Sequence, residues 1–336
     1  SGYHHGEMSL NKAIVGLAQN YVGANNVNLL MPNGQFGTRL EGGKDAASER
    51  YIYTELNPLV EYIYPVEDMP LLNYLNDDGY MVEPDYYLPI LPMTLVNGGK
   101  GIGTGYSYEG LCYNPKQIIT FVKNKIKGIE NKNNVSIEPY YENFKGSIQK
   151  INEKKFMIKG VYQIISSDSI RITELPIGTW TTNYKEFLES LMDDKNKKKK
   201  PVVKAINDMS TDAMVDLTVK FHPNTLGKLV SKQVDQYHNL LEKTLKLYCT
   251  KQTTNMHLFN HKQQLKKYET IYDIIDCYYP VRKDGYVRRK AYLIEHLEKI
   301  VMVLSNKARF IKEQCDDTID LRKKKKQQVI ELLKSR

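Results

Sequence analysis

The residues with the clearest chemical potential are an adjacent arginine and tyrosine, Arg50 and Tyr51. A free phenol has a pKa of about 10, so it is a poor nucleophile at neutral pH unless a neighbour stabilises the phenolate or removes the proton. Arg50 can supply fixed positive charge, and its planar guanidinium suits a phosphate. His5 could donate a hydrogen bond or shuttle a proton. This set predicts attack of Tyr51 on a phosphodiester, the step needed to cut and reseal DNA. Because the chain has 25 tyrosines, packing is the alternative interpretation.

A glycine-rich loop at residues 97–105 reads Asn-Gly-Gly-Lys-Gly-Ile-Gly-Thr-Gly. It is not a Walker A loop, because Lys100 is followed by glycine rather than Ser or Thr. Ile102 stands alone between glycines. Such a residue can wedge between base steps of DNA, or it can be a buried apolar residue in a tight loop. The residues alone leave both interpretations open.

Ligands for a metal ion are not evident in the pattern. The adjacent acidic pairs at 77–78 and 193–194 have side chains that usually diverge, whereas Mg²⁺ sites need clustered carboxylates. His257 and His261 have one-turn spacing, but Leu258 stands where a zinc protease helix needs Glu. The sequence therefore predicts no metal site in this chain.

Composition indicates a globular protein of two or three domains, since 336 residues with 41% apolar content exceed a single core. No apolar run approaches the roughly 20 residues that span a bilayer, and no signal-peptide pattern opens the chain, so no membrane partner is expected. Four widely separated cysteines without CxxC spacing indicate reduced thiols in an intracellular protein. The chain starts within an amphipathic element without Met, which suggests a piece of a longer protein.

Charge is distributed unevenly along the chain. Residues 1–120 hold 6 Lys/Arg and 13 Asp/Glu, a net −7, whereas residues 121–336 hold the remaining 42 and 26, a net +16. Basic chains often bind phosphate backbones, although solubility alone could explain the total. DNA contact near Tyr51 would require a local cluster of basic side chains at the surface. Its candidate cations are Lys12, Arg39, Lys44 and Arg50.

The elements that must position these residues can be read from periodicity. Residues 7–22 have the three-four spacing of an amphipathic helix, and residues 25–39 are typical of turns and short strands. Residues 51–54 are β-prone, and Asn57-Pro58 is a good helix start. This order predicts a winged-helix domain over residues 1–120.

The later residues change character twice. Short β-rich pieces at 155–158, 162–165 and 170–172 predict a mixed α/β domain over 121–225, with Lys197–Lys200 in a solvated loop. A near three-four apolar rhythm then predicts one long helix over Leu226–Tyr248.

Beyond Tyr248, helices are expected at 270–279 and 287–311, and residues 318–333 could return antiparallel along the first long helix. We therefore expect an α+β, predominantly helical protein with a long antiparallel coiled coil and a helical gate at 226–336. Its exposed apolar and tyrosine-rich surface predicts a homodimer contact over 270–312.

Several motifs together resemble eukaryotic-type DNA topoisomerase II, a type IIA enzyme, in order and over essentially the whole chain. They are Tyr-His-His-Gly-Glu at 3–7, Gly-Gln-Phe-Gly-Thr-Arg at 34–39, Gly-Gly-Lys-Asp-Ala-Ala-Ser at 42–48, Arg50-Tyr51, the loop at 97–105, Asn-Phe-Lys-Gly at 143–146, Thr-Glu-Leu-Pro at 173–176 with Thr-Trp-Thr at 179–181, and Asn-Lys-Ala-Arg-Phe-Ile at 306–311.

The resemblance implies that Tyr51 forms a 5′-phosphotyrosine link, that Arg50 stabilises the charged transition state, and that His5 contacts the scissile phosphate. It makes Ile102 the intercalating wedge. The other expected DNA contacts are Gln35, Arg39, Lys12, Lys44 and Lys100.

The resemblance also assigns the three ranges 1–120, 121–225 and 226–336 to a winged-helix domain, a tower, and a coiled coil with its gate. The family's ATPase domain and its Mg²⁺-binding TOPRIM domain are not in this chain, so Mg²⁺ and ATP are expected only with the full enzyme. The partner is double-stranded DNA, and the location is the nucleus, or host cytoplasm if the Lys-, Asn- and Tyr-rich composition reflects a large DNA virus. The alternatives are a non-catalytic dimeric DNA-binding module and, less well matched, a tyrosine recombinase.

Overall fold

The computed structural model describes residues 3–129, 135–192 and 201–335. The predicted loop at Lys197–Lys200 and the acidic pair at 193–194 lie outside these residues. The chain forms two compact units. The first comprises Ser1–Val66 and Leu72–Arg282, and the second comprises Glu67–Leu71 and Lys283–Arg336. The predicted boundaries at residues 120 and 225 lie inside the first unit and stay predictions.

The beginning of the first unit is irregular apart from short elements. It contains α1 (Glu7–Ala18), the 3-10 turn η1 (Glu49–Tyr51), α2 (Leu59–Ile63) and the hairpin of β1 (Tyr74–Asp77) and β2 (Tyr80–Pro84). The predicted helix over residues 7–22 is confirmed, although it ends earlier. Asn25 closes this end, because its amide donates to the Gly16 and Gln19 carbonyls at 2.8 Å each.

One hydrophobic core joins distant parts of the first unit. It lies among α3 (Met93–Val96), α4 (Pro115–Ile126) and the start of α8 (Ile271–Cys315), with Leu95, Ile118 and Ile275 fully buried. Asn114 caps α4, since its side chain accepts from the Lys116 N–H. The hairpin of β3 (Gly99–Gly103) and β4 (Tyr106–Gly110) leaves this core.

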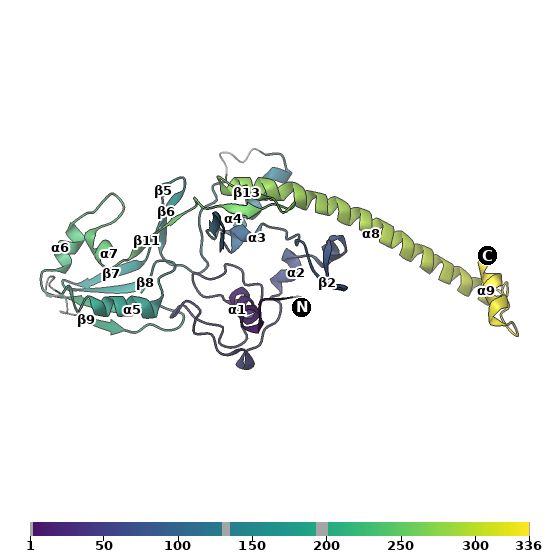
Figure 1. Cartoon of the computed structure of the whole chain (residues 1–336), viewed down its shortest axis with the longest axis horizontal. Coiled ribbons are helices and arrows are strands. Elements are labelled where there is room, and N and C mark those ends of the chain that lie inside the picture. Colours follow the sequence, from purple (N-terminus) through teal and green to yellow (C-terminus); the bar gives the residue numbers. More distant parts are fainter. Residues whose placement is uncertain (1–2, 130–134, 193–200, 336) are drawn as a thin grey trace. The chain divides into compact units, whose positions relative to one another are not determined.

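A second core covers a four-stranded antiparallel sheet, whose order is β7 (Val161–Ser166), β8 (Ser169–Glu174), β10 (Leu217–Phe221) and β9 (Val203–Asp208). Ile170, Ile172, Leu217 and Val219 alternate along their strands and are completely buried. The sheet packs against α5 (Thr181–Ser190), α6 (Leu226–Ser231) and α7 (Leu240–Thr244) (Figure 1). All three predicted β pieces are confirmed.

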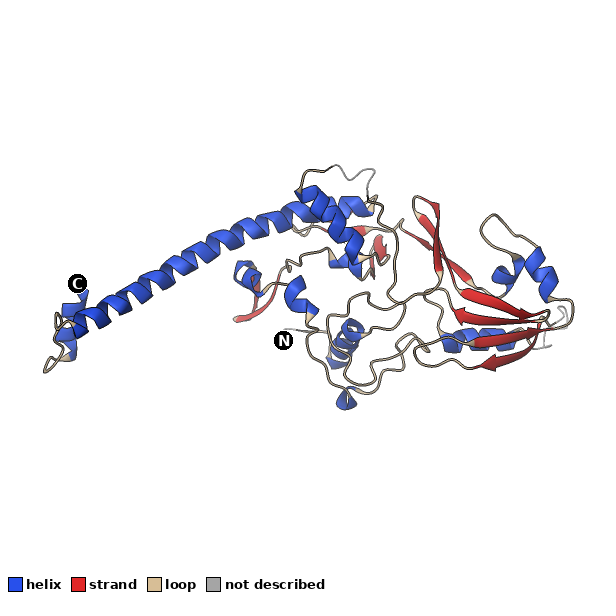
Figure 2. Cartoon of the chain, turned by 180° about the vertical axis from the view of Figure 1, so that it is seen from behind, coloured by secondary structure: helices blue, strands red, loops and turns tan. Residues whose placement is uncertain are grey.

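A three-stranded sheet has the order β11 (Tyr248–Gln252), β6 (Lys155–Lys159) and β5 (Ser147–Asn152), and a short hairpin joins β12 (His257–Phe259) to β13 (Leu265–Lys267). Figure 2 shows these strands among loops and short helices. The fold is thus a mixture of helices and strands, which the expected α+β class describes and the expected predominance of helix fits only loosely.

The predicted long helix over Leu226–Tyr248 is wrong. Two short helices and the start of β11 occupy this range. The Asp235 carboxylate accepts from the backbone N–H groups of Tyr237 and His238 at 2.7 and 2.9 Å, a local turn that competes with helix. Asn239 then starts α7 with a capping box. The first arm of the predicted coiled coil is therefore not a continuous helix.

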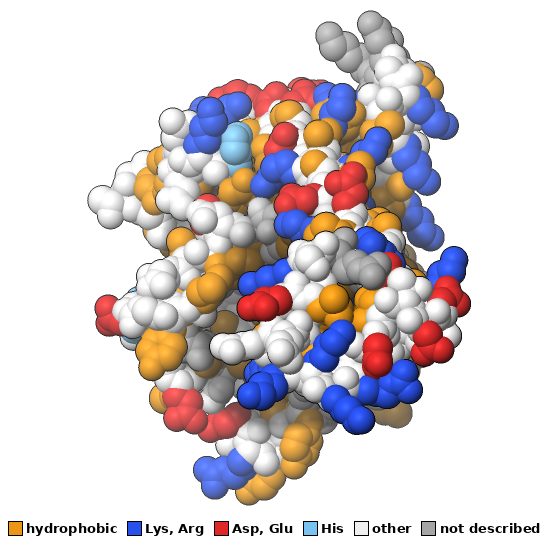
Figure 3. All heavy atoms as spheres, turned by 90° about the vertical axis from the view of Figure 1, so that its right-hand side faces the viewer, with side chains coloured by type: hydrophobic (Ala, Val, Ile, Leu, Met, Phe, Trp, Pro, Cys, Tyr) orange, Lys and Arg blue, Asp and Glu red, His pale blue; other side chains and the backbone are white. Residues whose placement is uncertain are grey.

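The second unit is built on α8 and α9 (Lys326–Lys334). The two helices expected at 270–279 and 287–311 are both helical but belong to α8, a single helix of 45 residues. The proposed return over 318–333 is helical only within α9. Many apolar side chains of α8 are exposed, among them Val287, Leu297, Val301 and Leu304. On the face drawn in Figure 3, charged side chains of both signs are interspersed with apolar ones.

Candidate active site and nucleic-acid interface

Tyr51 lies on a segment that is held mainly by its backbone. We define the Tyr51 segment as residues 29–33 and 49–57, two stretches that pair in antiparallel fashion. The residues between them, 34–48, form the loop behind the segment. Isolated bridges join Leu30 to Leu56 and Asn33 to Tyr53. The segment is tied to α1 because the Leu29 N–H donates to the Leu17 carbonyl at 3.0 Å. The residues predicted as β-prone at 51–54 therefore pair only at Tyr53, while Tyr51 ends the turn η1.

The Tyr51 side chain projects into solvent, with 71% of its surface exposed. Its backbone N–H donates to the Ser48 carbonyl at 3.0 Å, which closes the turn. The Arg50 Cζ lies 6.0 Å from the centroid of the Tyr51 ring, and the Arg50 side chain is also exposed. The cation and the phenol thus stand together where a phosphate could reach both.

Other tyrosines of the chain differ from Tyr51 in environment. Tyr113, Tyr141 and Tyr184 are buried, and burial raises the pKa of each phenol above its ordinary value. These three serve in packing; the Tyr184 hydroxyl, for example, donates to the Leu245 carbonyl at 2.7 Å. Exposure therefore separates the candidate nucleophile from these packing tyrosines.

The predicted His5 and its neighbour in the motif, His4, are both exposed and have different neighbours. The His5 ring meets Tyr3 edge-on at 5.6 Å, and His4 Nε2 lies 3.0 Å from the Asp77 carboxylate. In the described residues the structure records no direct contact between His5 and Tyr51. The role of His5 stays a prediction that a bound phosphate would have to complete.

Three glycine and tryptophan motifs converge behind the Tyr51 segment. A Cβ at Gly37 would lie 2.6 Å from the Gly43 Cα, and one at Gly42 would lie 2.3 Å from the Trp180 ring. Gln19 donates to the Phe36 and Gly43 carbonyls at 3.0 and 3.1 Å. The motifs at 34–39 and 42–48 therefore form one tight loop that packs on Trp180 of the motif at 179–181, with close approaches that only glycine permits.

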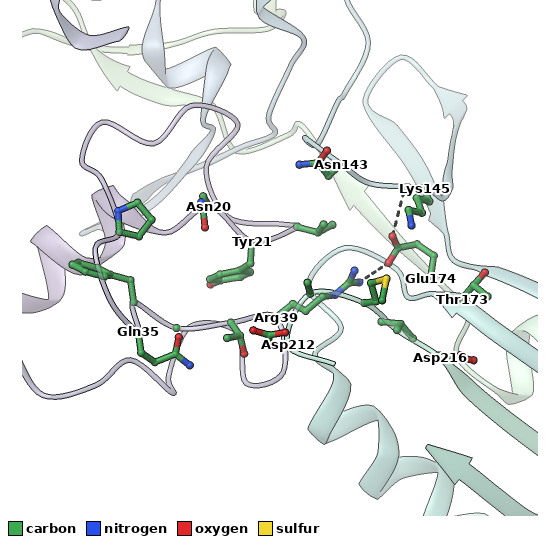
Figure 4. A pocket seen from close by; sticks show the side chains of 18 of the residues that line it. Asn20, Tyr21, Gln35, Arg39, Asn143, Lys145, Thr173, Glu174, Asp212 and Asp216 are labelled. Atoms are coloured by element: carbon green, nitrogen blue, oxygen red, sulfur yellow. Dashed lines mark hydrogen bonds and ion pairs between the residues drawn. The ribbon is translucent and has the colours of Figure 1, made fainter. Parts of the chain in front are cut away.

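Arg39 is a correction to the predicted DNA contacts. Only 5% of Arg39 is exposed, and its guanidinium donates to Glu174 Oε1 at 2.5 Å; Glu174 itself is 1% exposed. The other Glu174 oxygen accepts from the Lys145 backbone N–H at 3.2 Å. Figure 4 shows this pair beside a hollow of about 720 Å³ that Tyr21 and Gln35 also line. Arg39 compensates a buried carboxylate and is not free for phosphate.

The remaining predicted DNA contacts lie at the surface. Lys12, Lys44 and Lys100 are exposed, and none of the three forms an ion pair with any residue that the structure describes. The Gln35 side chain is also exposed, while its carbonyl accepts from the Ala47 N–H at 2.9 Å. These four side chains are available to a partner.

Ile102 is 83% exposed on β3, directly opposite Ser107 of β4. The interpretation of a buried apolar residue in a tight loop is therefore wrong. His257 and His261, whose one-turn spacing lacks the Glu of a zinc protease helix, lie at β12 and in the turn after it. Among the described residues, no group of three or more His, Cys, Asp or Glu side chains is arranged to hold a metal ion, and no helix is long and apolar enough to cross a membrane.

Sequence reasoning missed the residues that hold this site together. Glu174 follows the apolar strand residues Ile170 and Ile172 and directly precedes Leu175, so a charged residue in a buried strand was the available signal. Gln19 and Trp180 carried no such signal, because their partners are backbone groups and glycines far away in the sequence.

Comparison with known proteins identifies the class to which this fold and site belong. The family model for the A-type subunit of DNA gyrase/topoisomerase IV matches residues 1–336, and the chain belongs to that family. The relatives include DNA topoisomerase 2 proteins. That of Pisum sativum is 41% identical to this chain over 100% of this chain and 22% of its own length. That of Bombyx mori is 44% identical over 99% of this chain and 21% of its own length. The chain thus spans about a fifth of these relatives.

One solved structure with the same fold is also similar to this chain in sequence. The Plasmodium falciparum topoisomerase II DNA-binding, cleavage and re-ligation domain has a TM-score of 0.93 and 41% identity, covering 100% of this chain and 44% of that one.

Proposed function

We propose that this chain is the breakage–reunion portion of a type II DNA topoisomerase, with Tyr51 as its nucleophile. The observation that carries the proposal is an exposed phenol beside an exposed guanidinium, on a segment fixed by backbone hydrogen bonds. The family membership and the relatives' names support it.

In the proposed step, the Tyr51 oxygen forms a bond to phosphorus while the bond from phosphorus to the 3′ oxygen breaks. A 5′-phosphotyrosine and a free 3′ hydroxyl result. Arg50 would stabilise the negative charge that develops on the phosphoryl oxygens, and His5 would donate a hydrogen bond to the same phosphate. Because one phosphoester replaces another, the reverse step reseals the strand without an energy source.

The proposal extends to the parent enzyme. Two copies of Tyr51, one from each half of a homodimer joined through residues 270–312, would cut opposite strands of a bent duplex so that a second duplex can pass. ATP and Mg²⁺ would be bound by domains outside this chain, and we assign no metal step to the described residues because they hold no suitable cluster. The expected location is the compartment of the genome, the nucleus or host cytoplasm.

The test joins this chain to its TOPRIM and ATPase domains and compares Tyr51→Phe with Tyr53→Phe. Tyr53 is a matched control, since it is equally exposed on the same segment. Denaturant-trapped protein–DNA adduct on end-labelled duplex should vanish with Tyr51→Phe and persist with Tyr53→Phe. An adduct that survives Tyr51→Phe contradicts the assignment. If the wild-type assembly binds DNA but never cleaves it with Mg²⁺ present, the non-catalytic DNA-binding module is the correct interpretation.

The proposed dimer rests on the exposed apolar side chains of α8. Light scattering of the chain at micromolar concentration should report a dimer, and a replacement of Leu297 by Asp should shift it toward monomer. Monomer alone for the unaltered chain would count against the 270–312 contact.

A further inference from the structure

The hairpin that carries Ile102 has little packing of its own. Three residues of β3 are glycines, at positions 99, 101 and 103, and glycine weakens a strand because it contributes no side chain. An isolated two-stranded hairpin is at best marginally stable in water. The direction of the Ile102 side chain must therefore be fixed by groups outside β3.

Tyr106 is the side chain placed to do this. It pairs with Gly103 across the hairpin, next to the Ile102–Ser107 pair. A Cβ added to Gly103 would lie 2.3 Å from the Tyr106 Cζ and 2.6 and 2.7 Å from the two Cε atoms. The phenol ring thus lies directly over the Gly103 backbone and fills the space that a side chain would occupy.

The Tyr106 ring also contacts two residues of β12. Phe259 meets it edge-on at 6.2 Å between centroids, and His257 lies at 6.4 Å. His257 Nδ1 is 3.3 Å from the Ser107 carbonyl oxygen, close enough for the ring N–H to donate. A bridge from Tyr108 to Met256 runs beside these contacts. Aromatic contacts of this kind can compensate for glycine in a strand.

We propose that Tyr106 is a positioning residue that clamps Gly103 and thereby presents Ile102 in a fixed direction for insertion between DNA base steps. The inference rests on the proposed function, which makes Ile102 the wedge. Wedging unstacks bases at a cost of a few kcal/mol per step. A wedge already fixed in direction inserts with less additional loss of conformational freedom than a mobile one.

The two glycines that flank Ile102 provide a matched pair of variants. A Cβ at Gly103 collides with the Tyr106 ring, whereas a Cβ at Gly101 meets no atom within 4 Å, and neither residue has a positive φ. Gly103→Ala must therefore displace the clamp, while Gly101→Ala leaves it in place. Tyr106→Ala removes the ring, and Tyr106→Phe retains it.

The experiment uses the whole chain and a duplex with 2-aminopurine at the bent step, whose fluorescence increases on unstacking. We expect Tyr106→Ala and Gly103→Ala to lower the inserted fraction by about two- to tenfold, the effect of freeing one or two ordered side chains. Tyr106→Phe and Gly101→Ala should match the wild-type chain. The salt dependence of binding should not change, because no phosphate contact is lost.

A double-mutant cycle separates positioning from a general structural effect. In an Ile102→Ala background, Tyr106→Ala should cost no further DNA affinity, since there is no wedge left to position. Additive losses of DNA affinity in the cycle would overturn the proposal. Equal losses of the inserted fraction for Gly101→Ala and Gly103→Ala would also overturn it, and so would wild-type fluorescence for Tyr106→Ala. If Ile102→Ala itself leaves the fluorescence unchanged, the proposed wedge fails, independently of Tyr106.

Discussion

The Tyr51 segment and the four-stranded sheet are stabilised in opposite ways. In the sheet, Ile170, Ile172, Leu217 and Val219 are completely buried, so apolar side chains define the structure. In the Tyr51 segment, residues 29–33 and 49–57, the side chains of Tyr51 and Tyr53 are exposed and the order comes from backbone pairs such as Asn33 with Tyr53.

The difference shows how a reactive side chain can be both exposed and fixed in place. A nucleophile for a large polymer must face solvent, so its side chain cannot contribute burial energy. Backbone hydrogen bonds, together with the close contacts of Gly37 and Gly42 behind the segment, make the Tyr51 segment rigid instead. Substitutions of the exposed side chains in the segment should therefore change activity more than stability, and substitutions of the buried residues behind it should do the reverse.

The largest expected effect is on stability, at Arg39. Arg39→Ala leaves the buried Glu174 carboxylate unpaired, which should lower the free energy of unfolding by about 3–5 kcal/mol. Urea unfolding followed by Trp180 fluorescence measures this. As a control, Arg39→Met combined with Glu174→Gln should recover part of the loss, because no charge then stays buried and the Gln side-chain oxygen can still accept from the Lys145 N–H. A loss below about 1 kcal/mol for Arg39→Ala, the range of a surface pair, would mean that the pair is solvated.

Arg50 is the matched arginine on the exposed side of the comparison. In the full enzyme, Arg50→Ala should lower the rate of adduct formation by about 10²–10³, the effect of removing one charge-stabilising group. The Trp180 unfolding midpoint should not move, because the Arg50 side chain is exposed. Arg50→Lys should recover only part of the rate, since it keeps the charge without the planar fork. If Arg50→Ala lowered the free energy of unfolding as much as Arg39→Ala, the contrast between an exposed and a buried arginine would be contradicted.

The same contrast decides what the sequence could predict. Strands of the four-stranded sheet were recognisable because burial imposes alternation. The roles of Tyr51 and Ile102 stay predictions: an Arg-Tyr pair is unusual, whereas the residues around Ile102 left two interpretations open until the family resemblance favoured the wedge. The apolar rhythm over Leu226–Tyr248 misled, because its residues serve short helices packed on the sheet and the start of β11. The local turn at Asp235 interrupts the helix despite the spacing.

Arg39 shows the second limit of sequence reasoning. Its neighbours in sequence suggest a cluster of basic side chains at the surface. Only the position of Glu174, far away in the sequence, shows that Arg39 belongs to a buried ion pair. The contacts that hold the Tyr51 segment likewise join residues far apart, as with Gln19 and Gly43 or Trp180 and Gly42. No local pattern encodes them, so the position of a charge in the fold could not be inferred from its position in the chain.

A smaller effect is expected at Asn57, where the segment ends. Its side-chain amide N–H donates to the Asn28 carbonyl at 2.8 Å. Its side-chain oxygen Oδ1 accepts from the Leu59 N–H at 3.0 Å at the start of α2. Asn57→Ala should lower the free energy of unfolding by about 1 kcal/mol, the usual value for a lost cap. Asn33→Ala is the control, because its side-chain bond to Glu55 is long, at 3.5 Å, and exposed. Equal losses for both variants would show that side-chain bonds do not define this segment's end.

The smallest expected effect concerns Lys44, which follows the glycine contacts and is exposed without an ion-pair partner among the described residues. If it contacts a phosphate, Lys44→Ala should reduce the slope of log binding constant against log salt by about 0.9, with little change in stability. Lys299→Ala is the control, since Lys299 is already paired with Glu295 at 2.6 Å on α8. An unchanged slope for Lys44→Ala would confine phosphate binding to other cations, such as Arg50, and would mean that the loop behind the Tyr51 segment supports the site without touching DNA.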